Sequence, residues 1–278
     1  MSTFVFLSVL AAALMHAVWN ALIKVGRDRL GGMMAMSLLE AAIALPVILL
    51  SPWPAAAVWP WLVVSGLVHT GYKLALVLAY SHGDLSRVYP ISRGAAPLLV
   101  LLIGAFLLTD RLTMAEIAGI VVLGTGILIM ARGVFGQNEP RRLLPYALLA
   151  AATTAAYTLI DGHGARISGD AMAYVAWMFL LDCLFFQMVF VIRRRRIVPQ
   201  MPPRAWLAGM MAAVASYGAY LIAVWAMTRA PIALVAALRE TSILFAVLIG
   251  WLLFGDRMHR GKAVAAALIV AGVVLTRL

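Results

Sequence analysis

Residues 86–131 read SRVYPISRGAAPLLVLLIGAFLLTDRLTMAEIAGIVVLGTGILIMA, and residues 232–277 read IALVAALRETSILFAVLIGWLLFGDRMHRGKAVAAALIVAGVVLTR. Placed over each other at an offset of 146, the two stretches share nine identities in 46 positions. Apolar helices match easily by chance, so the polar and glycine matches carry the weight. These matches are Arg93 with Arg239, Asp110-Arg111 with Asp256-Arg257, Gly104 with Gly250, and Gly126 with Gly272. The pattern indicates an internal repeat.

The composition around this repeat is that of a membrane protein. Of the 278 residues, 64% are hydrophobic and 12% are charged, whereas soluble domains have about 45–50% apolar and about 25% charged residues. Apolar runs of about 20 residues are each long enough to cross a hydrocarbon core of about 30 Å. The sequence predicts an all-α integral membrane protein with ten transmembrane helices, at about 3–24, 33–51, 59–80, 86–108, 112–131, 142–160, 172–192, 204–228, 231–254 and 258–277.

The longest predicted connection divides the chain into two repeats of five helices. We expect a first repeat at 1–132, a linker loop at 133–141 and a second repeat at 142–278. Because five is an odd number, consecutive copies must cross the membrane in opposite directions. Inverted repeats that meet at a midplane site are a transporter architecture.

The positive charge lies mostly in short loops between apolar runs. A formal net charge of +11 would suggest nucleic acid in a soluble protein, but basic loops next to apolar helices are typical of helix ends that face an anionic leaflet. Loops after the odd-numbered predicted helices hold fifteen Lys and Arg residues, against four on the other side. This imbalance predicts a multi-pass protein of the cell inner (plasma) membrane with both termini on the non-cytoplasmic side.

Six ionisable residues lie well inside predicted helices: Lys73, Arg93, Arg239, Glu40, Asp182 and Glu240. Charged side chains are costly in a bilayer and commonly mark a solute or ion pathway. Three are cations and three are carboxylates, so their formal charges sum to zero. An alternative interpretation is therefore that they form ion pairs that lock helices together.

Polar and aromatic side chains share helix faces with these charges. The predicted solute-binding residues are Arg93, Arg239, Lys73, Tyr89, Tyr72, Trp19, Asn20, His16, Tyr217 and Tyr220. The predicted coupling residues are Glu240, Glu40, Asp182 and His69. Two alternatives stay open: the histidines can instead form interhelical hydrogen bonds, and the tyrosines can pack with a polar tip.

Enzyme motifs are absent from the sequence. There is no phosphate-binding loop, nucleophile elbow or His-Glu-x-x-His. Cys183, the single cysteine, can form neither an intrachain disulfide nor a thiolate metal site. We predict no enzymatic activity, no cofactor and no metal site. The expected partners are a small-molecule solute, membrane lipids and protons as a coupling ion, with no nucleic acid.

The chain resembles the EamA branch of the drug/metabolite transporter superfamily. The matching pieces are His16-Ala-x-Trp19-Asn20 with Lys24, the segment Ala152–Asp161, and the strings Asp110-Arg111-Leu112-Thr113 and Asp256-Arg257-Met258. The resemblance implies ten helices in an inverted repeat around a cavity lined mainly by the third, fourth, eighth and ninth helices, and partly by the first and sixth. Many members of the family have cytoplasmic termini, which is the reverse of what the loop charges predict here.

The leading functional prediction is a secondary active transporter, an exporter, of a small metabolite bearing carboxylate or phosphonate groups. Arg93 and Arg239 occupy equivalent positions, and arginine binds oxyanions through a planar fork. An amino acid or an amino-acid-derived compound would suit this site. One alternative is an exporter of cationic or amphipathic drugs that uses the buried carboxylates. Alternatives of another class are a membrane-embedded lipid enzyme and a structural membrane subunit.

Overall fold

The computed structural model describes residues 1–23, 28–82, 93–132, 144–254 and 260–278, and these residues form helices and short connections without a strand. The all-α prediction is confirmed for them. The helices are α1 (Thr3–Ile23), α2 (Arg29–Leu50), α3 (Trp59–His82), α5 (Ala96–Leu107), α6 (Met114–Arg132), α7 (Leu144–Ser168), α8 (Ala171–Arg194), α9 (Pro203–Met227), α10 (Ile232–Arg239), α11 (Ser242–Phe254) and α12 (Arg260–Leu275).

Several helices are long and apolar enough to cross a bilayer. Within the described residues, six segments meet this condition: Thr3–Asn20, Leu30–Leu50, Trp59–Ala79, Ala171–Arg194, Pro203–Met227 and Ile232–Ile249. Three shorter apolar helices accompany them: Ala96–Leu107, Met114–Met130 and Gly261–Leu275. Large apolar side chains are exposed on the outside of the bundle, for example Leu50 at 88% and Phe106 at 82%. The chain is therefore built as a multi-pass membrane protein.

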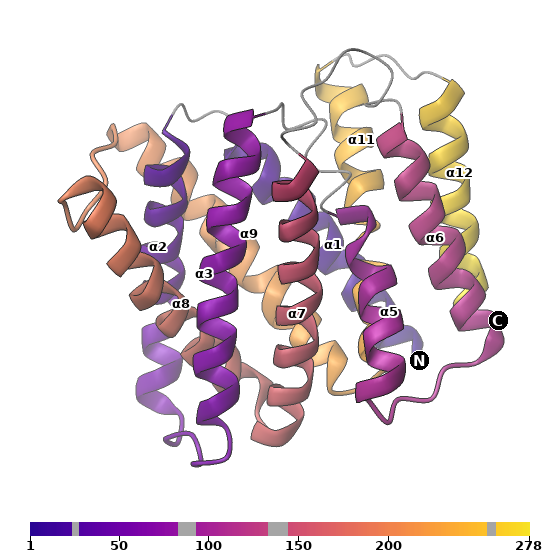
Figure 1. Ribbon diagram of the computed structural model, residues 1–278, viewed down its shortest axis with the longest axis horizontal. Coiled ribbons are helices and arrows are strands. Elements are labelled where there is room, and N and C mark those ends of the chain that lie inside the picture. The colour runs from indigo at the N-terminus through magenta and orange to yellow at the C-terminus, as the bar shows by residue number, and fades with distance from the viewer. Residues whose placement is uncertain (24–27, 83–92, 133–143, 255–259) are drawn as a thin grey trace.

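The helices stand side by side, with α6 and α12 packed together at one end of the molecule and α2 and α8 at the other (Figure 1). Between these ends, α1 packs on α9 and α3 packs on α7. α10 contacts α5, and α1 also contacts α11. The two chain ends lie on the same side of the bundle, where the Arg277 guanidinium donates to the Met1 carbonyl at 2.9 Å.

Glycines allow α6 and α12 to approach closely. A Cβ atom on Gly272 would lie 2.6 Å from the Leu123 nitrogen and 2.7 Å from the Gly119 carbonyl oxygen, and both are backbone atoms. A Cβ on Gly126 would lie 3.0 Å from the carbonyl oxygen of Ala265. Small residues at such contacts let helix backbones approach each other in membranes. The glycine match between Gly126 and Gly272 therefore has a packing explanation.

An ion pair ties several helix ends together on the side of the chain termini. Arg166, near the end of α7, donates to both carboxylate oxygens of Asp110, at 2.7 and 3.1 Å. It also donates to the carbonyls of Met227 and Ala230 at the end of α9. Asp110 accepts a further hydrogen bond from the Ile232 N–H at 2.8 Å, which caps the start of α10. Asp256, the sequence equivalent of Asp110, lies outside the described residues.

The helix predicted at 142–160 ends too early. α7 continues to Ser168, because Asp161 is held inside the bundle by hydrogen bonds and Arg166 is satisfied at the end of the helix. The prediction ended the helix where its polar residues begin. The predicted helix at 231–254 is also different, because it is divided into α10 and α11.

Candidate functional site

The helix from Ile232 to Phe254 is interrupted in its middle. α10 ends at Arg239 and α11 begins at Ser242, with Glu240 and Thr241 forming a turn between them. The backbone N–H groups of Glu240 and Thr241 each donate to the carbonyl three residues earlier, at 3.1 Å. This tighter pattern replaces the α-helical ladder. Interruptions of this kind, buried in protein, form ion and solute sites in transporters.

The first half of the chain has an interruption at the aligned position. Arg93 is helical, Ala95 is a bend and α5 begins at Ala96. Pro97 is in the first turn of α5 and has no N–H to donate to the carbonyl of Arg93, four residues earlier. Ala96 and Ser242, the first residues of the two helices after the interruptions, are 146 residues apart, which is the offset of the sequence repeat.

An ion pair connects the two interruptions. Arg93 Nη1 donates to Glu240 Oε1 at 3.1 Å, and the two side chains are 3% and 4% exposed. Glu240 also lies close enough to Arg239 to interact electrostatically with it. The acid that follows Arg239 in the sequence thus bonds to the arginine of the other half. Neighbouring side chains on a helix point about 100° apart, which leaves Glu240 directed away from Arg239.

Arg239 is buried at 7% exposure, at the end of α10. Its guanidinium carbon lies 5.2 Å from the centre of the Tyr220 ring, in a cation–π contact. Among the described residues, no carboxylate lies within ion-pair distance of Arg239. This part of the site therefore carries a buried cation whose described side-chain contact is an aromatic face.

α1 contributes His16 to the same cluster. His16 lies close enough to Arg93 and Arg239 to interact electrostatically with both. Its Nδ1 accepts a hydrogen bond from Trp19 Nε1 at 3.1 Å, which orients the ring. Asn20, a predicted solute-binding residue, donates instead to the His16 carbonyl at 2.7 Å. The structure thus brings His16 near the arginines, whereas the Asn20 amide is bonded to its own helix.

Lys73 belongs to a second buried group. Its ammonium donates to the Asp182 carboxylate and to the Ser37 hydroxyl, from α8 and α2 respectively. Glu40 lies close enough to Lys73 and Asp182 to interact with both, yet within the described residues neither of its carboxylate oxygens has a hydrogen-bond partner. The described hydrogen bonds of Lys73, a predicted solute-binding residue, are thus made within this group and not with the arginines.

A buried carboxylate that was not among the predicted site residues forms a third group. Asp161 on α7 has no exposed surface. It is bonded to His69 Nε2 at 2.9 Å, to the Tyr174 hydroxyl at 3.1 Å and to the Tyr220 hydroxyl. Asp161 was not predicted, because the predicted helix ended at residue 160. The helical spacing of Tyr157, Asp161 and Gly164 is the signal that would have placed it on a buried face.

The charge balance changes with this residue. Within the described residues, the fully buried ionisable groups include three cations, Lys73, Arg93 and Arg239, but four carboxylates, Glu40, Asp161, Asp182 and Glu240. Among the described residues, the buried carboxylates therefore outnumber the buried cations by one, whereas the sequence predicted equal numbers. A proton on His69 or on one of the carboxylates would restore neutrality.

Aromatic rings surround these groups. Tyr72 meets Tyr157 edge to face at 5.5 Å, and Tyr217 stacks on Phe179 at 5.0 Å between ring centres. These two predicted solute-binding tyrosines therefore have packing contacts in the structure. Tyr89, also predicted, lies outside the described residues. No group of three or more His, Cys, Asp or Glu that could hold a metal ion occurs in the described part of the chain.

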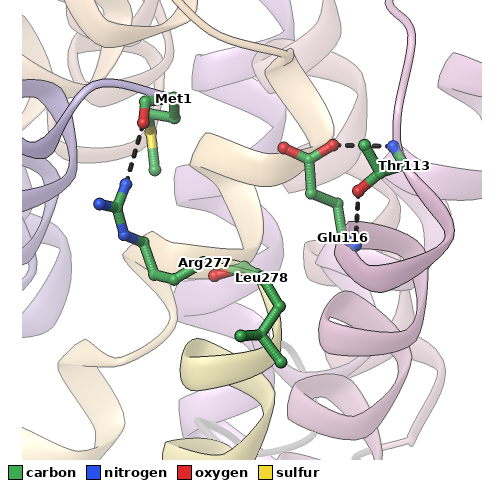
Figure 2. Close-up of a pocket in the computed structure, with 6 residues that line it drawn as sticks. Met1, Thr113, Glu116, Arg277 and Leu278 are labelled. Carbon is green, nitrogen blue, oxygen red and sulfur yellow. Dashed lines mark hydrogen bonds between the residues drawn. The ribbon is translucent and has the colours of Figure 1, made fainter.

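An open pocket of about 300 Å³ lies near the chain ends rather than at the buried charges (Figure 2). Its polar groups have structural partners. Thr113 and Glu116 cap the start of α6 reciprocally, since each accepts a hydrogen bond from the backbone N–H of the other. Arg277 binds the Met1 carbonyl. The pocket contains none of the predicted site residues.

Comparison with known proteins identifies the family. The model of the EamA-like transporter family matches the chain twice, at residues 3–132 and 142–278. No curated protein matches the chain in sequence. A solved structure titled "Crystal structure of protein" has 19% sequence identity and a TM-score of 0.77, covering 100% of this chain and 99% of its own, and this likeness concerns the fold alone. The chain belongs to the EamA-like transporter family, a branch of the drug/metabolite transporter superfamily.

Proposed function

We propose that this chain is a secondary transporter for a small polar metabolite that bears a carboxylate or phosphonate group, such as an amino acid or a compound derived from one. The observation that carries this proposal is Arg239. It is a buried cation at a helix interruption, and among the described residues it has an aromatic face and no ion-paired carboxylate. An oxyanion of the solute can supply the missing charge through the planar fork of the guanidinium.

The neighbouring ion pair gives the solute a second point of attachment. A solute anion that reaches Arg93 competes with Glu240, which lies 3.1 Å from the guanidinium. Glu240 displaced in this way would stand in a poorly solvated environment and favour proton uptake. Glu240 is therefore our first coupling residue, with Glu40, Asp182 and His69 as further candidates.

We also propose that the two matched regions are inverted copies, 1–132 and 142–278, joined by the loop 133–141. In the second copy, the counterparts of α1, α3 and α5 are α7, α9 and α11. The packing supports this proposal, because two helix contacts are preserved when each helix is exchanged for its counterpart. The contact of α1 with α9 corresponds to that of α3 with α7, and the contact of α1 with α11 corresponds to that of α5 with α7. Loop charge favours an inner-membrane protein with external termini.

Counterflow into liposomes tests the proposed substrate class. The purified full-length protein is reconstituted, loaded with unlabelled solute, and given labelled L-glutamate, L-alanine or aminomethylphosphonate outside. We expect at least one probe to enter faster than in protein-free liposomes. Arg239→Gln should lower this uptake about tenfold or more, because a charge-assisted hydrogen bond contributes about 1.5–3 kcal/mol. Arg239→Lys should also reduce it, since lysine lacks the bidentate fork.

The matched control is Arg204→Gln, the same chemical change on an exposed arginine at the start of α9. Uptake should be retained in this variant. If all three anionic or zwitterionic probes fail to exchange, or if Arg239→Gln exchanges them as the parent does, the proposed substrate class is wrong.

The surroundings of Glu40 favour a second candidate function, the export of cationic or amphipathic compounds. Glu40 is 1% exposed. It lies near Lys73 and the Ser216 hydroxyl, but among the described residues neither carboxylate oxygen forms a hydrogen bond of normal geometry, so an organic cation could pair with it. Counterflow of labelled tetraphenylphosphonium distinguishes the two functions. Uptake of this cation that is lost in Glu40→Gln and retained in Arg239→Gln would favour the cation exporter.

A further inference from the structure

Asp161 is the centre of a hydrogen-bond network that joins four helices. It lies on α7 and is hydrogen-bonded to His69 on α3, Tyr174 on α8 and Tyr220 on α9. The Tyr220 hydroxyl also lies 3.3 Å from His69 Nε2. Tyr157, one turn before Asp161, stacks on the His69 ring with 4.2 Å between ring centres. The histidine and the carboxylate are thus held together inside the protein.

Tyr220 connects this network to Arg239. Its hydroxyl is bonded to Asp161, whereas its ring faces the Arg239 guanidinium at 5.2 Å. The side chain therefore stands between a buried anion and a buried cation that has no ion-paired carboxylate in the described residues. Because the interior screens charge weakly, a change of charge at Arg239 acts on Asp161 across the ring.

We propose that the Asp161–His69 pair is a proton-binding site whose occupancy is linked to solute binding at Arg239 through Tyr220. This proposal rests on the proposed function. When a solute anion neutralises Arg239, the Asp161–His69 pair loses the positive charge on the other face of Tyr220 and takes up one proton from water. The same linkage makes the protonated protein bind the anion more tightly. The solute and the proton then cross the membrane together.

Among the described residues, Arg239 is the arginine that is connected to Asp161 through Tyr220. From the packed helices, the titratable groups near it are His69, Tyr157, Tyr174, Tyr220 and Arg239. α5 also packs on α7 and has no ionisable residue. Lys73 is bonded to Asp182 and Arg93 to Glu240. These two cations keep their own carboxylates, so Arg239 is the buried cation that is expected to act on Asp161 through Tyr220.

A first experiment needs no solute. Infrared difference spectra of the purified full-length protein between neutral and acid pH resolve carboxylic acid and imidazolium bands. We expect an acid-linked band in the parent that is lost in both Asp161→Asn and His69→Gln. In Arg239→Gln the band should persist to higher pH by about one unit, because one counter-charge has been removed. A parent spectrum without such a band, or a band unchanged in Asp161→Asn, would overturn the proposal.

A second experiment measures the linkage. For whichever of L-glutamate, L-alanine and aminomethylphosphonate shows counterflow, the dissociation constant is measured against pH. It should weaken about tenfold per pH unit as the pH rises through the range of linkage, since one proton accompanies each solute. In Asp161→Asn this slope should be lost, whereas counterflow at a fixed pH should continue.

Tyr174→Phe is the matched control, because it removes a donor to the same carboxylate from a side chain without a described contact to Arg239. It should keep the pH slope. Loss of the slope in Tyr174→Phe together with Asp161→Asn would indicate a purely structural network and overturn the proposal. Counterflow that is absent in the parent contradicts the proposed function instead, and the infrared measurement then still tests the proton site.

Discussion

The Arg93–Glu240 pair should contribute strongly to the stability of the folded protein, and this contribution should depend on both partners. Arg93 Nη1 and Glu240 Oε1 are 3.1 Å apart, and the side chains are 3% and 4% exposed, so water has little access to a partner left alone. Removing one member of a buried ion pair costs about 3–5 kcal/mol. Arg93→Gln and Glu240→Gln should each destabilise the protein by this amount. At this chain length the apparent Tm should fall by roughly 6–20 °C.

The double variant should behave differently, because neither member of the Arg93–Glu240 pair is left buried without the other. Arg93→Gln with Glu240→Gln should lie within about 1 kcal/mol of the parent, since replacing a whole buried pair is often close to neutral. The four proteins form a double-mutant cycle, measured by thermal unfolding of the detergent-solubilised full-length chain. Its coupling energy should be about 3 kcal/mol or more.

The surface pair Arg194–Asp28 is the control for this cycle. Its atoms are 2.7 Å apart, but both side chains are 47% exposed. Such pairs contribute about 0–1 kcal/mol, so Arg194→Gln should change the apparent Tm little. Our reasoning is refuted if Arg93→Gln costs no more than Arg194→Gln, or if the double variant is less stable than both single variants.

Three further predictions follow from packing, hydrogen bonding and loop charge. Gly272→Ala should lower the free energy of unfolding by about 1–3 kcal/mol, because its Cβ would meet backbone atoms at 2.6 and 2.7 Å. Gly261→Ala should not lower it, because no atom lies within 4 Å of the added Cβ. Equal losses in the two variants would contradict the packing argument. Arg166→Gln should be less stable by about 1–3 kcal/mol, because it removes hydrogen bonds at the ends of α7 and α9. Arg204→Gln should show no measurable loss of stability, and equal stabilities of the two variants would refute this prediction. A reporter fused after Leu278 should be active outside the cytoplasm, and a cytoplasmic signal would reverse the proposed orientation.

Most helix positions could be predicted because apolar runs of membrane length are unambiguous. The predicted helix at 3–24 is observed at Thr3–Ile23, and that at 204–228 at Pro203–Met227. The prediction was wrong where a polar residue is buried by partners from other helices. Asp161 looks like a helix end in the sequence, but His69 and two tyrosines satisfy it inside the bundle. Such compensation depends on tertiary packing, and the sequence of the helix itself signals it only through the spacing of Asp161 with Tyr157 and Gly164.

The site was predictable as a set of residue types but not as a set of pairs. The repeat singled out Arg93 and Arg239, and the structure places both next to helix interruptions. The pairing of Glu240 with Arg93 across the two halves could not be foreseen, because it depends on how α10 faces the first half. Pro97 is a sequence signal for the first interruption, because proline lacks the N–H that would continue the helix through the bend at Ala95. The second interruption has no proline and gave no comparable signal.

One sequence difference between the halves explains why Arg239 lacks an ion-paired carboxylate in the described structure. Arg239 is the last residue of α10, where a cation is favoured by the carbonyl end of the helix dipole. The residue after Arg239 is Glu240, in the turn before α11; the residue after Arg93 is Gly94. The repeat thus supplies two arginines and a single adjacent acid. Since Glu240 bonds to Arg93, the cation of the second half is left to the Tyr220 ring, and the asymmetry between Gly94 and Glu240 creates the charge that a solute anion can neutralise.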